Sequence, residues 1–518
     1  MGKGSVGVFF ILFLIVFVAF QNCGGFKAID EASNSDNSVI YKTFRLSPAG
    51  TYARCYALLV RARVPASDAG LVAVKAGSKS AVSACMDLVA KADFALTGQL
   101  AAPNDPIALA VLKTMNDFHR QWFPVDVIED SVPADGRLWA AMAEAQDMSE
   151  MGLHITRALL MPGAKYSDVV TRSTTLRTQR RPAAGNTAIL GANEFDFMRI
   201  NLIVGPLLPG KTYPEPDAFA DWPNQSVVPR GQLFGVTDQQ AMILPGFPGV
   251  PNTNINNFPQ FLSPAAFDVH LNNGGGVLGS PSYLMLNFGR KLGDHSDGGA
   301  NMPRRWAKAV LNDILCRDLP AIRLGDASPR VQSASPVSFR KGLSCMQCHS
   351  TMDPIAATAR NFEFVHSAQM DGGIDDRGTI NLRPIPPTMS AAEIQPVNPD
   401  PDYYLRPAQG YLYYRSYDGS LVDQAVMGMA DLGSKIAAGN DLYACAAKKY
   451  YFYFTGAQVS LQDIGDATKP ELNSADIKRR DFVIDLGQKL KTDQSLKNLM
   501  RAIFESAAFQ DSGYGGAE

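Results

Sequence analysis

The sequence predicts a mainly α fold, in which multi-domain helical bundles flank an irregular Pro- and Gly-rich middle and a small domain forms around a Cys and His motif. Three observations lead to this fold class. Apolar residues recur at helical spacing toward both ends of the chain, 11 of the 33 prolines fall between Pro206 and Pro264, and 46% of the 518 residues are hydrophobic. Such a chain can bury a large core and is long enough for about two to four domains.

The N-terminus has the features of an export signal. Lys3 precedes an unbroken apolar stretch from Val6 to Phe20, which is shorter than the roughly 20 residues that span a bilayer. We therefore expect a signal peptide over 1–22, with an uncleaved N-terminal anchor as the alternative. Cys23, directly after this stretch, resembles the processing site of bacterial lipoproteins, where the cysteine becomes the lipidated first residue.

The segment after Cys23 has the composition of a tether. The run from Glu31 to Ser38 is polar, so 23–42 is expected to hold a soluble body away from a membrane. Because Gly24 rather than Asp follows the cysteine, we expect the outer membrane. The predicted location is the cell envelope, lipid-anchored on the periplasmic side.

Helix start signals mark the body of the chain. Three dipeptides place a capping side chain before a Pro at the first helical position: Ser47-Pro48, Asp105-Pro106 and Ser280-Pro281. After Asp105, apolar residues fall on one helix face at spacings of three and four, namely Ile107, Val111, Met115, Phe118 and Trp122.

These signals, with the prolines, divide the body into segments. We expect an N-terminal helical domain over 43–185, an irregular Pro-rich segment over 186–268, a helical segment over 269–335, a Cys and His motif domain over 336–400 and a C-terminal helical domain over 401–518.

The strongest chemical signal is the motif Cys345-Met346-Gln347-Cys348-His349. On a helix its two thiols and its imidazole can converge on one ligand, because the cysteines are three apart and His349 is four from Cys345. This CxxCH pattern is typical of a c-type haem, in which the thiols bond to the vinyl groups and the histidine ligates iron. The alternatives are a thiol redox pair, which needs a βαβ setting, and a zinc site, which needs a fourth ligand. We predict one covalent haem c on 336–400.

The residues around this motif resemble those of the planctomycete-type cytochromes. Asp353-Pro354 and Asn361-Phe362 follow the CxxCH at similar spacing, although Ala356 stands where that family often has Gly. The similarity continues in order from Tyr41 to the C-terminus, through Gly276 to Leu284, Ile314 to Cys316, Asp418-Gly419, Cys445, Tyr450 to Phe454 and Phe509. The resemblance implies a haem-bearing, mostly helical protein of the cell envelope, without an established substrate.

The second axial position of the iron separates an electron carrier from a catalyst, since Met or His fills it in a carrier and an open site can bind peroxide or oxygen. Met352 is only three residues past His349 and cannot reach the opposite face. Met389 is our first choice, because such ligands generally come from a loop tens of residues later. Other candidates are Met370, Met427, Met429 and His366, and each methionine can instead fill the core.

The remaining cysteines predict two disulfides. Subtracting the lipid and haem cysteines from seven leaves Cys55, Cys85, Cys316 and Cys445. In an oxidising periplasm four cysteines allow three connectivities, and the alternative is four buried thiols. Cys55 with Cys85 is favoured because both fall on neighbouring predicted helices. The family resemblance implies Cys316 with Cys445, since both belong to segments that flank the haem there.

The charge balance excludes one class of partner. With 48 Lys and Arg against 50 Asp and Glu, the net charge of −2 gives no basic footprint for nucleic-acid phosphates. The predicted function is an exported c-type cytochrome lipoprotein that takes part in electron transfer in the cell envelope. Its partners would be a redox-partner protein or a small-molecule electron donor, and the membrane through the lipid anchor. The alternatives are a haem-dependent dehydrogenase or peroxidase and a non-catalytic scaffold with a structural haem.

Overall fold

The computed structural model divides the chain into two units, 1–42 and 43–518. It describes residues 45–123, 150–181, 232–239, 274–288, 303–360, 362–367, 379–384, 390, 403 and 405–511. The predicted signal peptide, the tether and Cys23 therefore lie outside the described residues. In the described part of the chain, no helix is long and apolar enough to cross a membrane.

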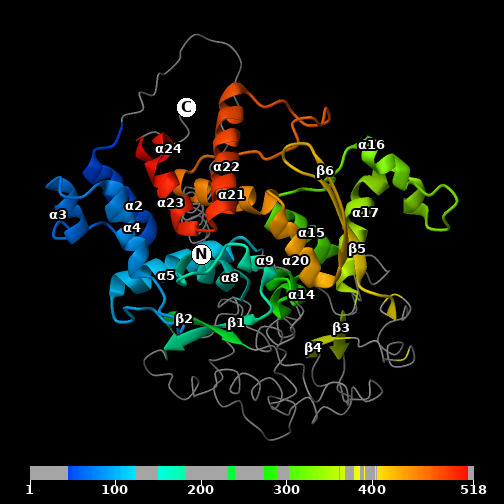
Figure 1. Ribbon diagram of the computed structural model, residues 1–518, viewed down its shortest axis with the longest axis horizontal. Coiled ribbons are helices and arrows are strands. Elements are labelled where there is room, and N and C mark those ends of the chain that lie inside the picture. The colour runs from blue at the N-terminus through cyan, green and yellow to red at the C-terminus, as the bar shows by residue number, and fades with distance from the viewer. Residues whose placement is uncertain are drawn as a thin grey trace, which may run out of the picture. The chain divides into compact units, whose positions relative to one another are not determined.

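Helices dominate the described residues, so the predicted mainly α fold class is confirmed (Figure 1). The N-terminal part contains α2 (Pro48–Val60), α3 (Ala69–Lys75), α4 (Ala81–Lys91), α5 (Pro106–Arg120), α8 (Glu150–Leu160) and α9 (Asp168–Thr171). The C-terminal part contains α20 (Gly428–Ala438), α21 (Asp441–Thr455), α22 (Ser474–Asp493), α23 (Leu496–Glu505) and α24 (Ala507–Gln510).

Further helices lie between these parts of the chain. They are α14 (Pro281–Phe288), α15 (Arg304–Ala309), α16 (Leu324–Ala327) and α17 (Leu343–Ala356), together with the 3₁₀ turns η2 (Gly276–Gly279), η4 (Ser328–Arg330), η5 (Ser338–Lys341) and η6 (Ala357–Ala359). After Ala309, α15 widens into a π-helical turn, η3 (Val310–Ile314).

The three predicted helix starts are confirmed. The side chain of Ser47 accepts a hydrogen bond from the backbone N–H of Gly50, and α2 begins at the following Pro48. Asp105 accepts from the backbone of the first turn of α5. Ser280 accepts from the backbone N–H of Tyr283 at the start of α14.

Among the described residues, strands, which the sequence pattern did not predict, form three antiparallel pairs. These are β1 (Thr175–Arg181) with β2 (Gln232–Gln239), β3 (Phe362–Ser367) with β4 (Thr379–Pro384), and β5 (Gln409–Arg415) with β6 (Leu421–Met427). Strand β2 lies inside the segment 186–268, which was expected to be irregular. The strand was missed because its pairing with the distant β1 is not encoded in the local sequence.

One apolar core includes residues from both the N-terminal and the C-terminal parts. Helix α23 packs against α4, and Figure 1 shows the red C-terminal helices beside the blue N-terminal ones. The hydroxyl of Tyr453 in α21 donates to the carbonyl of Leu58 in α2 at 3.0 Å. Two segments predicted as separate helical domains therefore fold around a shared core.

Both predicted cysteine pairs lie at disulfide distance. Cys55 of α2 and Cys85 of α4 have Cα atoms 5.9 Å apart, and those of Cys316 and Cys445 are 5.3 Å apart. Both separations fall in the range that a disulfide spans. The first pair links neighbouring helices, and the second joins the end of the α15–η3 segment to α21.

Candidate functional site

Helix α17 carries the CxxCH motif on its outward side. Cys345 is exposed, Cys348 is partly exposed, and the side chain of His349 is 22% exposed. The helical repeat places these three residues on one face, while Met346, Ser350 and Thr351 on the other side are buried. The structure therefore brings the three predicted haem residues together on a single accessible helix face.

The imidazole of His349 is held in a fixed orientation. The ring of Phe339, from η5, stacks on it with ring centroids 4.0 Å apart. Its Nδ1 lies 3.1 and 3.2 Å from the two carboxylate oxygens of Asp353, one turn along α17. Its Nε2 has no hydrogen-bond partner among the described residues. A metal-binding histidine typically has this arrangement, with one ring nitrogen fixed and the other available.

Arg304 of α15 holds Asp353 in place. Its Nε donates to Oδ1 at 2.7 Å and its Nη2 donates to Oδ2 at 3.2 Å, which makes the ion pair bidentate. The two side chains are only 11% and 15% exposed. Next to Arg304, Trp306 is fully buried and donates to the carbonyl of Leu278, so α15 itself is anchored in the core.

A small apolar cluster supports α17 from behind. Met346 packs with Ile322, Ala327 and Tyr413, and the side-chain amide of Gln347 donates to the carbonyl of Ile322 at 3.3 Å. These contacts fix the rotation of the helix about its axis. The cysteines and His349 consequently face outward.

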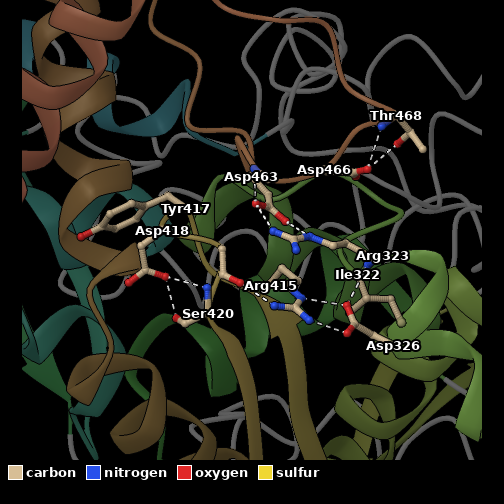
Figure 2. Close-up of polar contacts among 12 residues, drawn as sticks. Ile322, Arg323, Asp326, Arg415, Tyr417, Asp418, Ser420, Asp463, Asp466 and Thr468 are labelled. Atoms are coloured by element: carbon tan, nitrogen blue, oxygen red, sulfur yellow. Dashed lines mark hydrogen bonds and ion pairs between the residues drawn. The ribbon is translucent and has the colours of Figure 1, made fainter.

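Two Arg–Asp pairs connect the segment that precedes α17 to other parts of the chain (Figure 2). Arg323 binds Asp463 through Nε and Nη2 at 2.7 and 2.8 Å, and Arg415 of β5 binds Asp326 of α16 at 2.8 and 2.5 Å. Asp326 also accepts from the backbone N–H of Arg323 at 3.0 Å. The facing guanidinium groups lower the pKa of both carboxyl groups, most of all through these side-chain hydrogen bonds. The network joins α16, β5 and the loop after α21.

The second cysteine of the motif lies in surroundings that disfavour its thiolate. Burial raises the pKa of the Cys348 thiol, the nearby Cys345 raises it further, and Lys308 lowers it. In a reactive CxxC pair the attacking thiol has a lowered pKa that favours the thiolate. Cys348 does not have the surroundings of such an attacking thiol.

The donor set fits a covalent haem. Two thiols one helical turn apart and an imidazole with an available Nε2 lie on the same accessible face, which is the chemistry that c-type attachment requires. Residues Cys345 and Cys348 would hold the porphyrin, and His349 would hold the iron.

The candidates for the second axial ligand are spread over different places. Met389, the first choice, and Met370 lie outside the described residues, and His366 is in β3, where side chains are not described. Met429 is buried in α20 at 3% exposure and packs in the core. Met427, at the end of β6, is 58% exposed. Among the described methionines of this group, Met427 is therefore the one whose side chain is exposed and available to bind iron.

Sequence reasoning missed three residues of the site. Asp353 was noted as part of a family motif but without a role, although its position four residues after His349 places it beside that ring on a helix. Phe339 and Arg304 carried no local signal, because Arg304 reaches Asp353 across 49 residues of chain. No family model, curated protein or solved structure matches the chain.

Proposed function

We propose that the chain is an exported c-type cytochrome lipoprotein that transfers electrons in the cell envelope. The observation that carries this proposal is the geometry of His349, whose Nδ1 is bound to Asp353 and whose Nε2 is available beside Cys345 and Cys348. A bound haem would supply a one-electron Fe(III)/Fe(II) couple, with which the protein would accept an electron from a redox-partner protein or small-molecule donor and pass it to an acceptor.

The residues of the chain would each have a defined part in this function. Cys345 and Cys348 would hold the porphyrin through thioether bonds, and His349 would be a ligand of the iron. Phe339 and Asp353 keep the imidazole in the orientation that presents Nε2. Acylation at Cys23 would tether the body to the periplasmic face of the outer membrane, where c-type attachment and disulfide formation both have the environment that they need.

The experiment that tests this function is haem staining of the protein, expressed with a haem-maturation system and run on a denaturing gel. The wild-type band should retain peroxidase stain, because the thioether bonds survive denaturation. The Cys345→Ser/Cys348→Ser variant should lose the stain, whereas Cys55→Ser/Cys85→Ser, a matched pair of cysteine changes, should keep it. An unstained wild-type band would contradict the proposal.

Absorbance spectra of the same protein distinguish its possible roles. A spectrum that changes on addition of dithionite and is insensitive to carbon monoxide is expected for a carrier whose second axial position is filled. Binding of carbon monoxide to the reduced protein would instead indicate an open position and would favour the oxidoreductase alternative. A haem that dithionite does not reduce would favour a structural role.

A further inference from the structure

The contact between His349 and Asp353 determines which ring nitrogen of His349 carries the hydrogen, as well as the orientation of the ring. A carboxylate can only accept hydrogen bonds, and both oxygens of Asp353 already accept from the guanidinium of Arg304 in a bidentate pair. The hydrogen in the contact must therefore be on Nδ1 of His349. This leaves the lone pair of Nε2 available for a metal.

We propose that Asp353, clamped by Arg304, is a positioning residue that strengthens His349 as an iron ligand and lowers the one-electron reduction potential of the haem. A carboxylate that accepts from Nδ1–H increases the basicity of the ligating imidazole. A more basic imidazole stabilises Fe(III) relative to Fe(II). This inference rests on the proposed function, because it requires that His349 ligates the haem iron.

The surroundings of the pair make this interaction effective. The side chains of Asp353 and Arg304 are 15% and 11% exposed, so water screens them little. Arg304 also lies over the ring of Phe339 at 5.3 Å, and that ring stacks on His349. One arginine thus holds both the hydrogen-bond acceptor of the imidazole and the aromatic ring that covers its face.

The test compares reduction potentials of haem-loaded proteins in a titration with dithionite and ferricyanide. Asp353→Asn removes the charged acceptor. The equilibrium ratio of reduced to oxidised protein should therefore rise at least tenfold, which raises the reduction potential by about 59 mV for a one-electron couple. Asp353→Glu keeps a carboxylate within reach of Nδ1 and should restore most of the difference. Asp423→Asn is the matched control, because it removes an exposed carboxylate paired with Arg330 and should leave the potential unchanged.

A spectroscopic measurement separates ligand strength from a general charge effect. The g-values of the ferric protein in electron paramagnetic resonance report the donor strength of the axial imidazole. They should move in Asp353→Asn and remain at the wild-type values in Asp423→Asn. Unchanged potential and g-values in an Asp353→Asn protein that retains its haem would overturn the inference.

A second variant covers the case in which Asp353→Asn does not fold or does not load haem. Arg304→Lys keeps the positive charge but loses the two-point contact that holds Asp353, so the carboxylate is held less firmly on Nδ1, the potential should rise and the g-values should move. An Arg304→Lys protein with wild-type potential and g-values would also overturn the inference. Failure of the wild-type protein to retain haem on a denaturing gel would instead overturn the proposed function.

Discussion

Gly410 of β5 lies directly against Pro354 of α17. A Cβ atom built on Gly410 would be 1.8 Å from the carbonyl oxygen of Pro354, and 3.1 Å from the Thr358 side chain. The strand and the motif helix can therefore pack this closely only because residue 410 has no side chain. The same strand supplies Tyr413 to the cluster behind Met346.

The Gly410→Ala substitution should destabilise the protein by about 1–3 kcal/mol or more, because backbone atoms must shift to admit the methyl group. Thermal or denaturant unfolding of the haem-loaded protein measures this change. Gly325→Ala is the control, since a Cβ there meets nothing within 4 Å and alanine in a helix is expected to be neutral or stabilising. Equal stability of the two variants would contradict the close contact.

His119 should make the stability depend on pH. It is fully buried, with Nδ1 2.8 Å from the hydroxyl oxygen of Thr156 and Nε2 2.7 Å from that of Tyr450. Burial lowers its pKa from 6.5 to about 3. Below pH 6.5 the unfolded chain binds a proton that the folded chain does not, so the free energy of unfolding falls as the pH drops toward 3.

The effect of His119 is best measured as the difference in the free energy of unfolding between wild type and His119→Gln. This difference should shrink by about 2–3 kcal/mol between pH 6.5 and roughly pH 4.5, because each pKa unit corresponds to about 1.4 kcal/mol. Burial raises the pKa of Asp313 to about 6, which has the opposite effect on stability, but that contribution is common to both proteins. Parallel pH profiles for the two proteins would show that His119 is not the source.

The disulfide between Cys316 and Cys445 should contribute more stability than the one between Cys55 and Cys85. Their sequence separations are 129 and 30 residues, for which the chain-entropy model gives about 5 and about 4 kcal/mol before any native strain. Unfolding of the two double Ser variants tests the order. Thiol titration of the denatured, haem-loaded protein should find these four cysteines unreactive until a reductant is added, and four reactive thiols without reductant would rule out both bonds.

Cys23 should determine membrane attachment. Substituting Cys23 with Ser removes the acylation site, and the protein should then appear in the soluble periplasmic fraction, because the lipid supplies the anchor. Fractionation followed by haem staining measures this, with Cys55→Ser/Cys85→Ser as a control that keeps the acylation site. Undiminished membrane association of the Cys23 variant would indicate an uncleaved N-terminal anchor.

The features that could be predicted from sequence are those with local causes. The starts of α2, α5 and α14 follow from a capping side chain and a neighbouring proline, and the CxxCH motif needs only one helical turn to assemble. The pairing of β5 with β6 was missed although Asp418-Gly419 is a turn signal between them. That signal was noted only as part of a family resemblance.

Features that depend on distant contacts could not be predicted in this way. Strands β1 and β2 pair across more than 50 residues, and Arg304 meets Asp353 through the packing of α15 against α17. Nothing in the local composition of either partner specifies the other. For the same reason the shared core of the N-terminal and C-terminal parts was not foreseen, since each part has an amphipathic pattern that is complete by itself.

The loop closed by Cys316 and Cys445 contains the CxxCH motif, and this has a consequence for how the protein matures. On the proposed function, Cys345 and Cys348 are thiols until haem is attached, and in a chain that has not yet folded such thiols can exchange with Cys316 and Cys445. On the proposed function, thioether formation removes both of these nucleophiles. Cofactor attachment would thus also protect the native cysteine pairing, and a cell that supplies haem too slowly should accumulate chains with scrambled disulfides.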